Sequence, residues 1–158
     1  MIIEIILFKQ ELLHDINAAL TRIERTRHLD DITLTTEGDD YSFDRQIESA
    51  LADVIKRTAA YQCIPSQHAQ RIQSNHTYDW QEKTILLNMP HEWLPANISP
   101  LRTACHNYIV HAVLYDQLSA MLPGDPYTLQ LLEQKTRYYS DINAALLHQT
   151  KIHPTPFG

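Results

Sequence analysis

The second half of the chain constrains the fold most, because its pattern predicts two amphipathic helices joined by a short turn. Apolar side chains recur every three or four residues over 99–149, the spacing of a helix packed on one side. Residues 122–126, Leu-Pro-Gly-Asp-Pro, separate the two runs and are typical of a turn. Ser99 and Asp125 each stand before a proline, which is the sequence of a capped helix start. The pattern therefore predicts an antiparallel helical hairpin.

The two helices of this hairpin differ in how much of their surface is apolar. The first, 99–121, is apolar around more than half of its circumference, which predicts the central and most buried helix. The second, 126–149, has a mixed charged face and one apolar face. The residues predicted for that apolar face are Leu129, Leu132, Thr136, Tyr139, Ile142 and Leu146.

The first half of the chain predicts two more helices and little sheet. Apolar periodicity marks one helix over 9–27, with Ile5 and Phe8 allowing an earlier start, and another over 43–61. Residues 84–89 are the best strand candidate, and 32–35 form a second. We therefore expect a mainly α protein: a four-helix bundle-like domain over 1–150 with one or two short strands in its loops. Prolines make 151–158 an extended C-terminal tail.

Composition narrows the functional class. A chain of 158 residues with 44% apolar and 20% charged residues fits one globular domain. Its net charge of −6 argues against a dedicated nucleic-acid-binding surface. The apolar N-terminus is too short to span a bilayer and contains Glu4, so we expect packed structure and no membrane partner. Cys63 and Cys105 form no CxxC motif and are expected to be buried thiols in a cytoplasmic protein.

No motif in the sequence predicts catalysis, a metal or a cofactor. The chain has nine histidines, but no HExxH motif occurs, and His106 and His111 lie on different sides of their helix. Cys105 belongs to an apolar stripe, which favours a core thiol over a nucleophile. The acidic loop 30–40 lacks the alternation of a calcium loop, and the three glycines are too scattered to cradle a phosphate. We therefore expect a protein that is not an enzyme.

Aromatic and tail residues are the candidates for a protein interface. Tyrosine and tryptophan are frequent interface anchors. Tyr138 and Tyr139 are adjacent in a helix, so one of them should lie at the rim or on a partner surface. The predicted interface residues are Trp93, Tyr115, Arg137, Tyr138, Tyr139, His153 and Phe157.

Four stretches together resemble a known family. They are the helix motif Leu-Leu-x-Asp-Ile-x-x-x-Leu-x-Arg over 12–22, the helix opening Tyr-Ser-Phe-Asp-Arg-Gln-Ile over 41–47, a strand ending at 89–90 and leading through Trp93, and the long helix around 108–115 with a tyrosine-rich helix and tail behind it. In this order they resemble the head–tail connector (adaptor) proteins of tailed double-stranded DNA phages, including prophage forms of Bacteroides-like genomes.

The resemblance implies a structural function in a virion. Connectors of this kind form rings beneath the portal, extend the DNA channel and present a docking surface to the next tail component. The implied partners are further copies of the chain, the portal and tail-completion proteins, with at most non-specific passage of DNA, and the implied location is the cytoplasm during assembly and then the virion. The alternative is a small helical binding or regulatory module that dimerises through the apolar helix 99–121.

Overall fold

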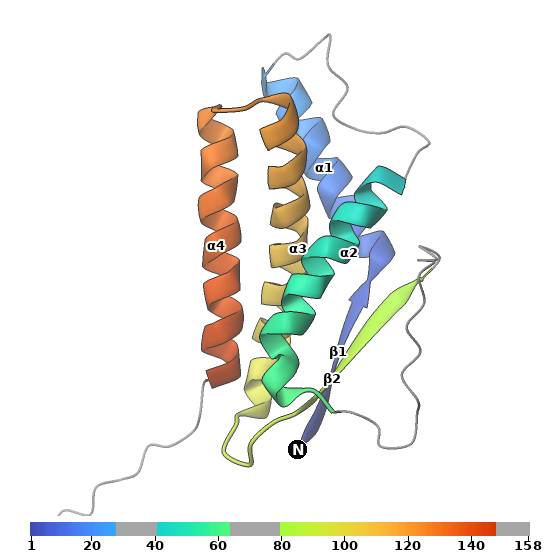
Figure 1. Ribbon diagram of the computed structural model, residues 1–158, viewed down its shortest axis with the longest axis vertical. Coiled ribbons are helices and arrows are strands. Elements are labelled where there is room, and N and C mark those ends of the chain that lie inside the picture. The colour runs from blue at the N-terminus through green and yellow to red at the C-terminus, as the bar shows by residue number, and fades with distance from the viewer. Residues whose placement is uncertain (28–40, 64–79, 148–158) are drawn as a thin grey trace, which may run out of the picture.

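The computed structural model describes residues 1–27, 41–63 and 80–147 and places four helices beside a small sheet (Figure 1). Its mainly α architecture confirms the predicted fold class. The predicted strand 32–35, the acidic loop and the tail lie outside the described residues. In chain order the elements are β1 (Ile2–Phe8), α1 (Lys9–Arg27), α2 (Tyr41–Thr58), a 3₁₀ turn (Ala59–Tyr61), β2 (Glu82–Asn88), a second 3₁₀ turn (Pro95–Asn97), α3 (Ile98–Met121) and α4 (Pro126–Leu147).

The predicted hairpin of helices α3 and α4 is present, with one difference at its start. α3 begins at Ile98, just before the predicted Ser99. α4 begins as predicted, because the carboxylate of Asp125 accepts a hydrogen bond from the Tyr127 amide at 2.8 Å. Gly124 takes a φ of 75° in the turn, a conformation that other residues adopt only with strain.

The N-terminal residues form a strand, which corrects the suggestion that α1 starts before Lys9. β1 pairs antiparallel with β2, so that Ile5 lies opposite Ile85. Side chains of β1 alternate between buried and exposed, as in a strand with one face on the core. The pattern is hard to recognise in the sequence because β1 finds its partner about eighty residues away. The prediction of a strand around 84–89 is confirmed.

α3 is the central helix, as predicted. It packs against α1, α2, α4 and β1, and Figure 1 shows it between α4 and the other elements. Most of its apolar side chains are used inside the monomer, and none of the large exposed apolar side chains of the described residues belongs to α3. The buried residues of α3 are Leu101, Ala104, Cys105, Tyr108, Ile109, Val110, Ala112, Val113, Leu114 and Leu118.

α4 is rotated relative to the prediction in its first half. Thr128 and Leu131 are buried there, whereas Leu129 is 57% exposed and Leu132 is 38% exposed. The expected apolar face holds only in the second half, where Ile142 is completely buried. Because α4 packs on α3 and shares no comparable contact with another described element, its outer side keeps the two leucines exposed.

Candidate functional site

The predicted interface residues of α4 form two seams where this helix meets α3. Tyr139 lies in the first seam, with its ring centroid 5.5 Å from that of Tyr108. Lys135 places its ammonium 6.0 Å from the Tyr108 ring and 5.5 Å from the Tyr115 ring, within reach of a cation–π contact. Arg57 of α2 lies over the Tyr139 ring at 5.7 Å. Tyr115 and Tyr139 are therefore both half-buried in this seam and are linked through Tyr108 and Lys135.

Tyr138 belongs to the second seam, with the α3 residue His111. Its ring centroid lies 4.8 Å from that of His111, and the Arg137 guanidinium lies 5.6 Å from the Tyr138 ring. One tyrosine of the pair was expected at the rim of the core or on a partner surface, and in the structure both lie at the rim. Both side chains are half-buried and pack against the core. A helix that packs on a single neighbour has a partly exposed flank on each side of the contact, so adjacent residues can occupy the two flanks.

Trp93 is a core residue, which corrects its inclusion in the predicted interface. Only 2% of its surface is exposed, and its indole N–H donates to the Ala145 carbonyl at 2.8 Å. The indole thus satisfies a carbonyl in the last turn of α4 and ties the start of α3 to the end of α4. His153 and Phe157 lie outside the described residues.

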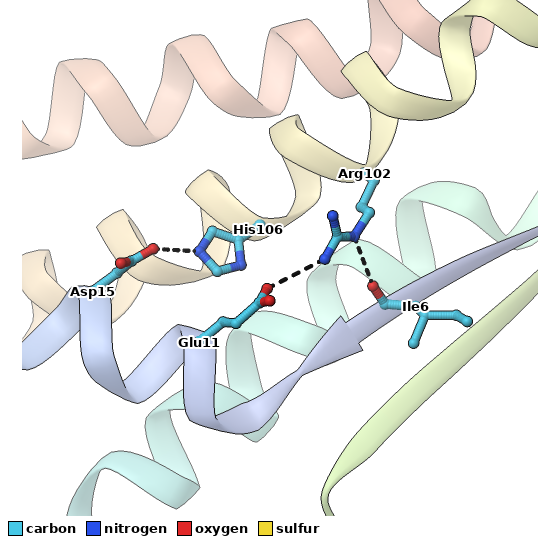
Figure 2. Close-up of polar contacts among 5 residues, drawn as sticks. All are labelled: Ile6, Glu11, Asp15, Arg102 and His106. Atoms are coloured by element: carbon cyan, nitrogen blue, oxygen red, sulfur yellow. Dashed lines mark hydrogen bonds and ion pairs between the residues drawn. The ribbon is translucent and has the colours of Figure 1, made fainter.

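The groove between α1 and α3 brings charged side chains of the two helices into contact, and Figure 2 shows these contacts. The His106 Nε2 lies 2.7 Å from an Asp15 carboxylate oxygen. One helical turn away, Arg102 meets Glu11 at 3.2 Å and donates from Nε to the Ile6 carbonyl at 3.0 Å. The groove encloses about 490 Å³ and is lined by Gln10, Glu11, His14, Asp15, Arg102, Thr103 and His106.

These pairs were missed in the sequence, although their spacing carries a signal. Glu11 and Asp15 are four residues apart on α1, and Arg102 and His106 are four apart on α3. Matching intervals of opposite charge let two packed helices form a ladder of ion pairs. Only the fold shows that α1 and α3 are neighbours, which a sequence without that information does not specify.

The groove has the composition of a polar contact surface. Glu11 and Asp15 are about half exposed, so each ion pair is worth at most about 1 kcal/mol. The pairs hold α1 on α3 and leave polar groups facing solvent.

The two other chemical candidates from the sequence are the thiol of Cys105 and a metal site built from histidines. Cys105 is completely buried, and burial raises the pKa of its thiol to about 12, so it stays protonated as a core residue. No group of three or more histidine, cysteine or acidic side chains in the described ranges is arranged to hold a metal ion. None of the helices described is long and apolar enough to cross a membrane.

The exposed apolar side chains identify the remaining candidate surface. Besides Leu129 and Leu132, Leu147 at the end of α4 is 63% exposed. Leu132 also borders a groove of about 310 Å³ whose other lining residues include Tyr108, Lys135 and Tyr139 of the aromatic seam. We call Leu129, Leu132 and this groove the α4 surface. Comparisons of the chain with protein-family models, with curated proteins and with solved structures found no match.

Proposed function

We propose that this protein works by assembly with other proteins, as a subunit that forms or joins the ring between the portal and the tail of a phage or prophage. The observation that carries the assembly function is the α4 surface. Leu132 lines a groove together with Tyr108 and Tyr139, and the exposed Leu129 lies one helical turn from Leu132. Apolar and aromatic side chains grouped in this way favour a contact with another protein. The assignment to a head–tail connector rests on the sequence resemblance described above.

The chemistry of the α4 surface suits a contact between proteins. Two charged residues, Asp53 and Lys135, and two aromatic residues, Tyr108 and Tyr139, are among those that line the groove. Apolar and aromatic side chains surrounded by charges are the usual composition of an interface core and rim. A ring requires a contact in which one face meets a different face of the neighbour, so the α4 surface would supply one side of it.

The test combines the protein with the portal protein encoded near its gene. We expect ring-shaped particles by electron microscopy and a solution mass well above that of the free subunit. A compact monomer or dimer at high concentration, with the portal present and without rings, contradicts the connector. Portal, capsid and tail genes beside this gene are the expected genomic context.

A matched pair of variants tests the α4 surface within that experiment. Leu129→Glu places a charge on the exposed leucine and should weaken ring formation or portal binding at least ten-fold, with unchanged circular dichroism. Gln130→Glu adds the same charge at an exposed neighbouring position and should leave assembly unchanged. Equal ring formation and portal binding by the two variants would contradict a contact through α4.

A further inference from the structure

The backbone of β1 has an edge that faces away from β2. In the antiparallel pair, Met89 donates to the Met1 carbonyl at 2.8 Å, and Lys9 donates to the Gln81 carbonyl at 3.0 Å. Odd-numbered residues of β1 therefore direct their N–H and C=O groups to β2. Because these groups alternate along an antiparallel strand, the even-numbered residues direct theirs to the other side.

This outer edge is open over its first half. The N–H and C=O groups of Ile2 and Glu4 and the N–H of Ile6 have no hydrogen-bond partner within the described residues. Ile2 is 68% exposed, and Glu4 is also exposed. Backbone groups repeated at every second residue are complementary to one kind of ligand, which is another extended chain.

Arg102 closes the edge at Ile6. Its guanidinium donates to the Ile6 carbonyl at 3.0 Å, while 45% of the Arg102 side chain stays exposed (Figure 2). A charged side chain over a strand edge is a device that limits pairing with other chains. The open stretch is therefore short and ends at a defined residue.

The side chains beside the open edge define the chemistry of a partner. Ile2, Glu4 and Ile6 lie on the same outer face of β1, because side chains alternate along a strand. No described cation pairs with Glu4, and its cross-strand neighbour is Leu86. A cationic side chain opposite Glu4, flanked by two apolar ones opposite the isoleucines, would complement this face.

We propose that the open edge of β1 binds an extended segment of a partner protein with the pattern apolar–x–basic–x–apolar, which adds to the sheet as a third strand. The proposal rests on the proposed function, since it names the kind of segment that an assembly partner would supply. The net charge of −6 favours a basic partner over a second copy of this acidic chain.

The first experiment follows the backbone amides of β1 by hydrogen exchange, detected by NMR. In the free protein, the amides of Ile3 and Ile5 should exchange slowly and those of Glu4 and Ile6 quickly. The probe is a capped peptide, Val-Thr-Lys-Thr-Val, added in excess. It should slow exchange at Glu4 and Ile6, whereas unchanged exchange at both would overturn the proposal.

Two comparisons separate the contribution of the backbone hydrogen bonds to peptide binding from that of the Glu4 charge. A peptide with glutamate in place of its lysine should bind about five-fold more weakly, because it brings like charges together. Glu4→Pro removes an outward N–H without breaking a β1–β2 hydrogen bond, and Glu4→Gln removes only the charge. Binding of the lysine peptide should be lost in the proline variant and only weakened in the glutamine variant. Equal binding by both variants would overturn a strand contact.

Removal of Arg102 gives a prediction of opposite sign. Arg102→Ala frees the Ile6 carbonyl and lengthens the open edge, so the uncharged peptide Val-Thr-Thr-Thr-Val should bind more tightly than to the unmodified protein. No gain with a folded variant would show that Arg102 does not limit the edge. Thr103→Ala, an exposed neighbour on α3, is the control and should leave binding unchanged.

The outcomes also distinguish this proposal from the proposed function. Rings that form with the portal while Glu4→Pro has no effect would refute the strand contact and leave the connector standing. Peptide binding at the edge without rings would refute the connector alone. Slow exchange at Glu4 that grows with protein concentration, without peptide, would identify a second copy as the occupant and overturn the proposal.

Discussion

Lys9 and Asp44 form an ion pair that is nearly withdrawn from solvent. The Lys9 ammonium lies 2.9 Å from the Asp44 carboxylate, with 14% and 5% of the two side chains exposed. The ammonium approaches Oδ1 outside the favoured direction of a hydrogen bond, so charge attraction is the main contribution of this contact. Trp80 covers the pair, with its ring centroid 5.7 Å from the ammonium. The pair joins the start of α1 to the start of α2.

Breaking this pair from one side should be costly. Lys9→Met leaves a buried carboxylate without its cation and should lower the free energy of unfolding by about 3–5 kcal/mol. Lys9→Met combined with Asp44→Leu removes both charges and should recover most of that loss. Urea unfolding of the single and double variants measures both values. A double variant as unstable as Lys9→Met would contradict the importance of the unpaired charge.

Protonation of His111 should make the stability of the second seam depend on pH. Burial lowers the pKa of His111, and the nearby Arg137 cation acts in the same direction, while hydrogen bonds to the Asn107 carbonyl and to Gln134 oppose them. The Asn107 carbonyl accepts from Nδ1 at 2.8 Å, which places the proton of the neutral ring on that atom. Folding therefore favours the neutral imidazole.

The lowered pKa predicts a loss of stability in acid. Below the ordinary histidine pKa of 6.5, the unfolded chain binds a proton that folded His111 resists, so the free energy of unfolding falls as the pH drops. His111→Gln should reduce this fall as the pH drops below about 6.5. Urea midpoints at several pH values measure the change, and the exposed His91→Gln is the control. An unchanged pH dependence in His111→Gln would contradict a role for this residue.

At the scale of elements, α3 determines the stability of the helical layer. Ile109 is completely buried at the centre of this helix. Ile109→Ala should lower the free energy of unfolding by about 2–5 kcal/mol, because the surrounding helices cannot collapse into the cavity. The exposed Thr103→Ala on the same helix should change it by less than about 0.5 kcal/mol. A small loss for Ile109→Ala would mean that α3 is not the central helix.

The elements differ in how well the sequence predicts them. α3 was predicted correctly because its apolar residues surround most of the helix, so any rotation buries a similar set. α4 offers two apolar stripes one residue apart, one through Leu129 and Leu132 and the other through Thr128 and Leu131. Hydrophobicity favours the first stripe, while packing against α3 selects the second. β1 was missed because its identity depends on pairing with β2.

The residues of the candidate surfaces could also be predicted only where a local sequence pattern determines their position. Tyr115 and Tyr139 could be chosen from the sequence because large aromatic residues at helical spacing lie near packing seams. Trp93 was misplaced because the same residue type also fills cores, and only the fold supplies the Ala145 carbonyl that its N–H requires. The ladder of ion pairs between α1 and α3 needs the relative placement of two helices, which local periodicity does not contain.

At the scale of the whole molecule, one hydrophobic core joins the sheet and all four described helices. Buried side chains at opposite ends of the chain, such as Ile5 of β1 and Ile142 of α4, belong to this core. A shared core of this size favours a single cooperative unfolding transition. The sheet and the helical hairpin should therefore lose their structure together.

Two substitutions in separate elements test this cooperativity. In a Trp80→Phe background, Trp93 is the only tryptophan and reports on the contact between the start of α3 and the end of α4. Ile5→Ala and Ile142→Ala should each lower the urea midpoint, and the midpoint from Trp93 fluorescence should equal that from far-ultraviolet circular dichroism in both variants. If Ile5→Ala lowered only the midpoint measured by circular dichroism, the sheet would unfold separately from the helices. Coincident shifts are expected because each cavity destabilises the one core that β1 and α4 share.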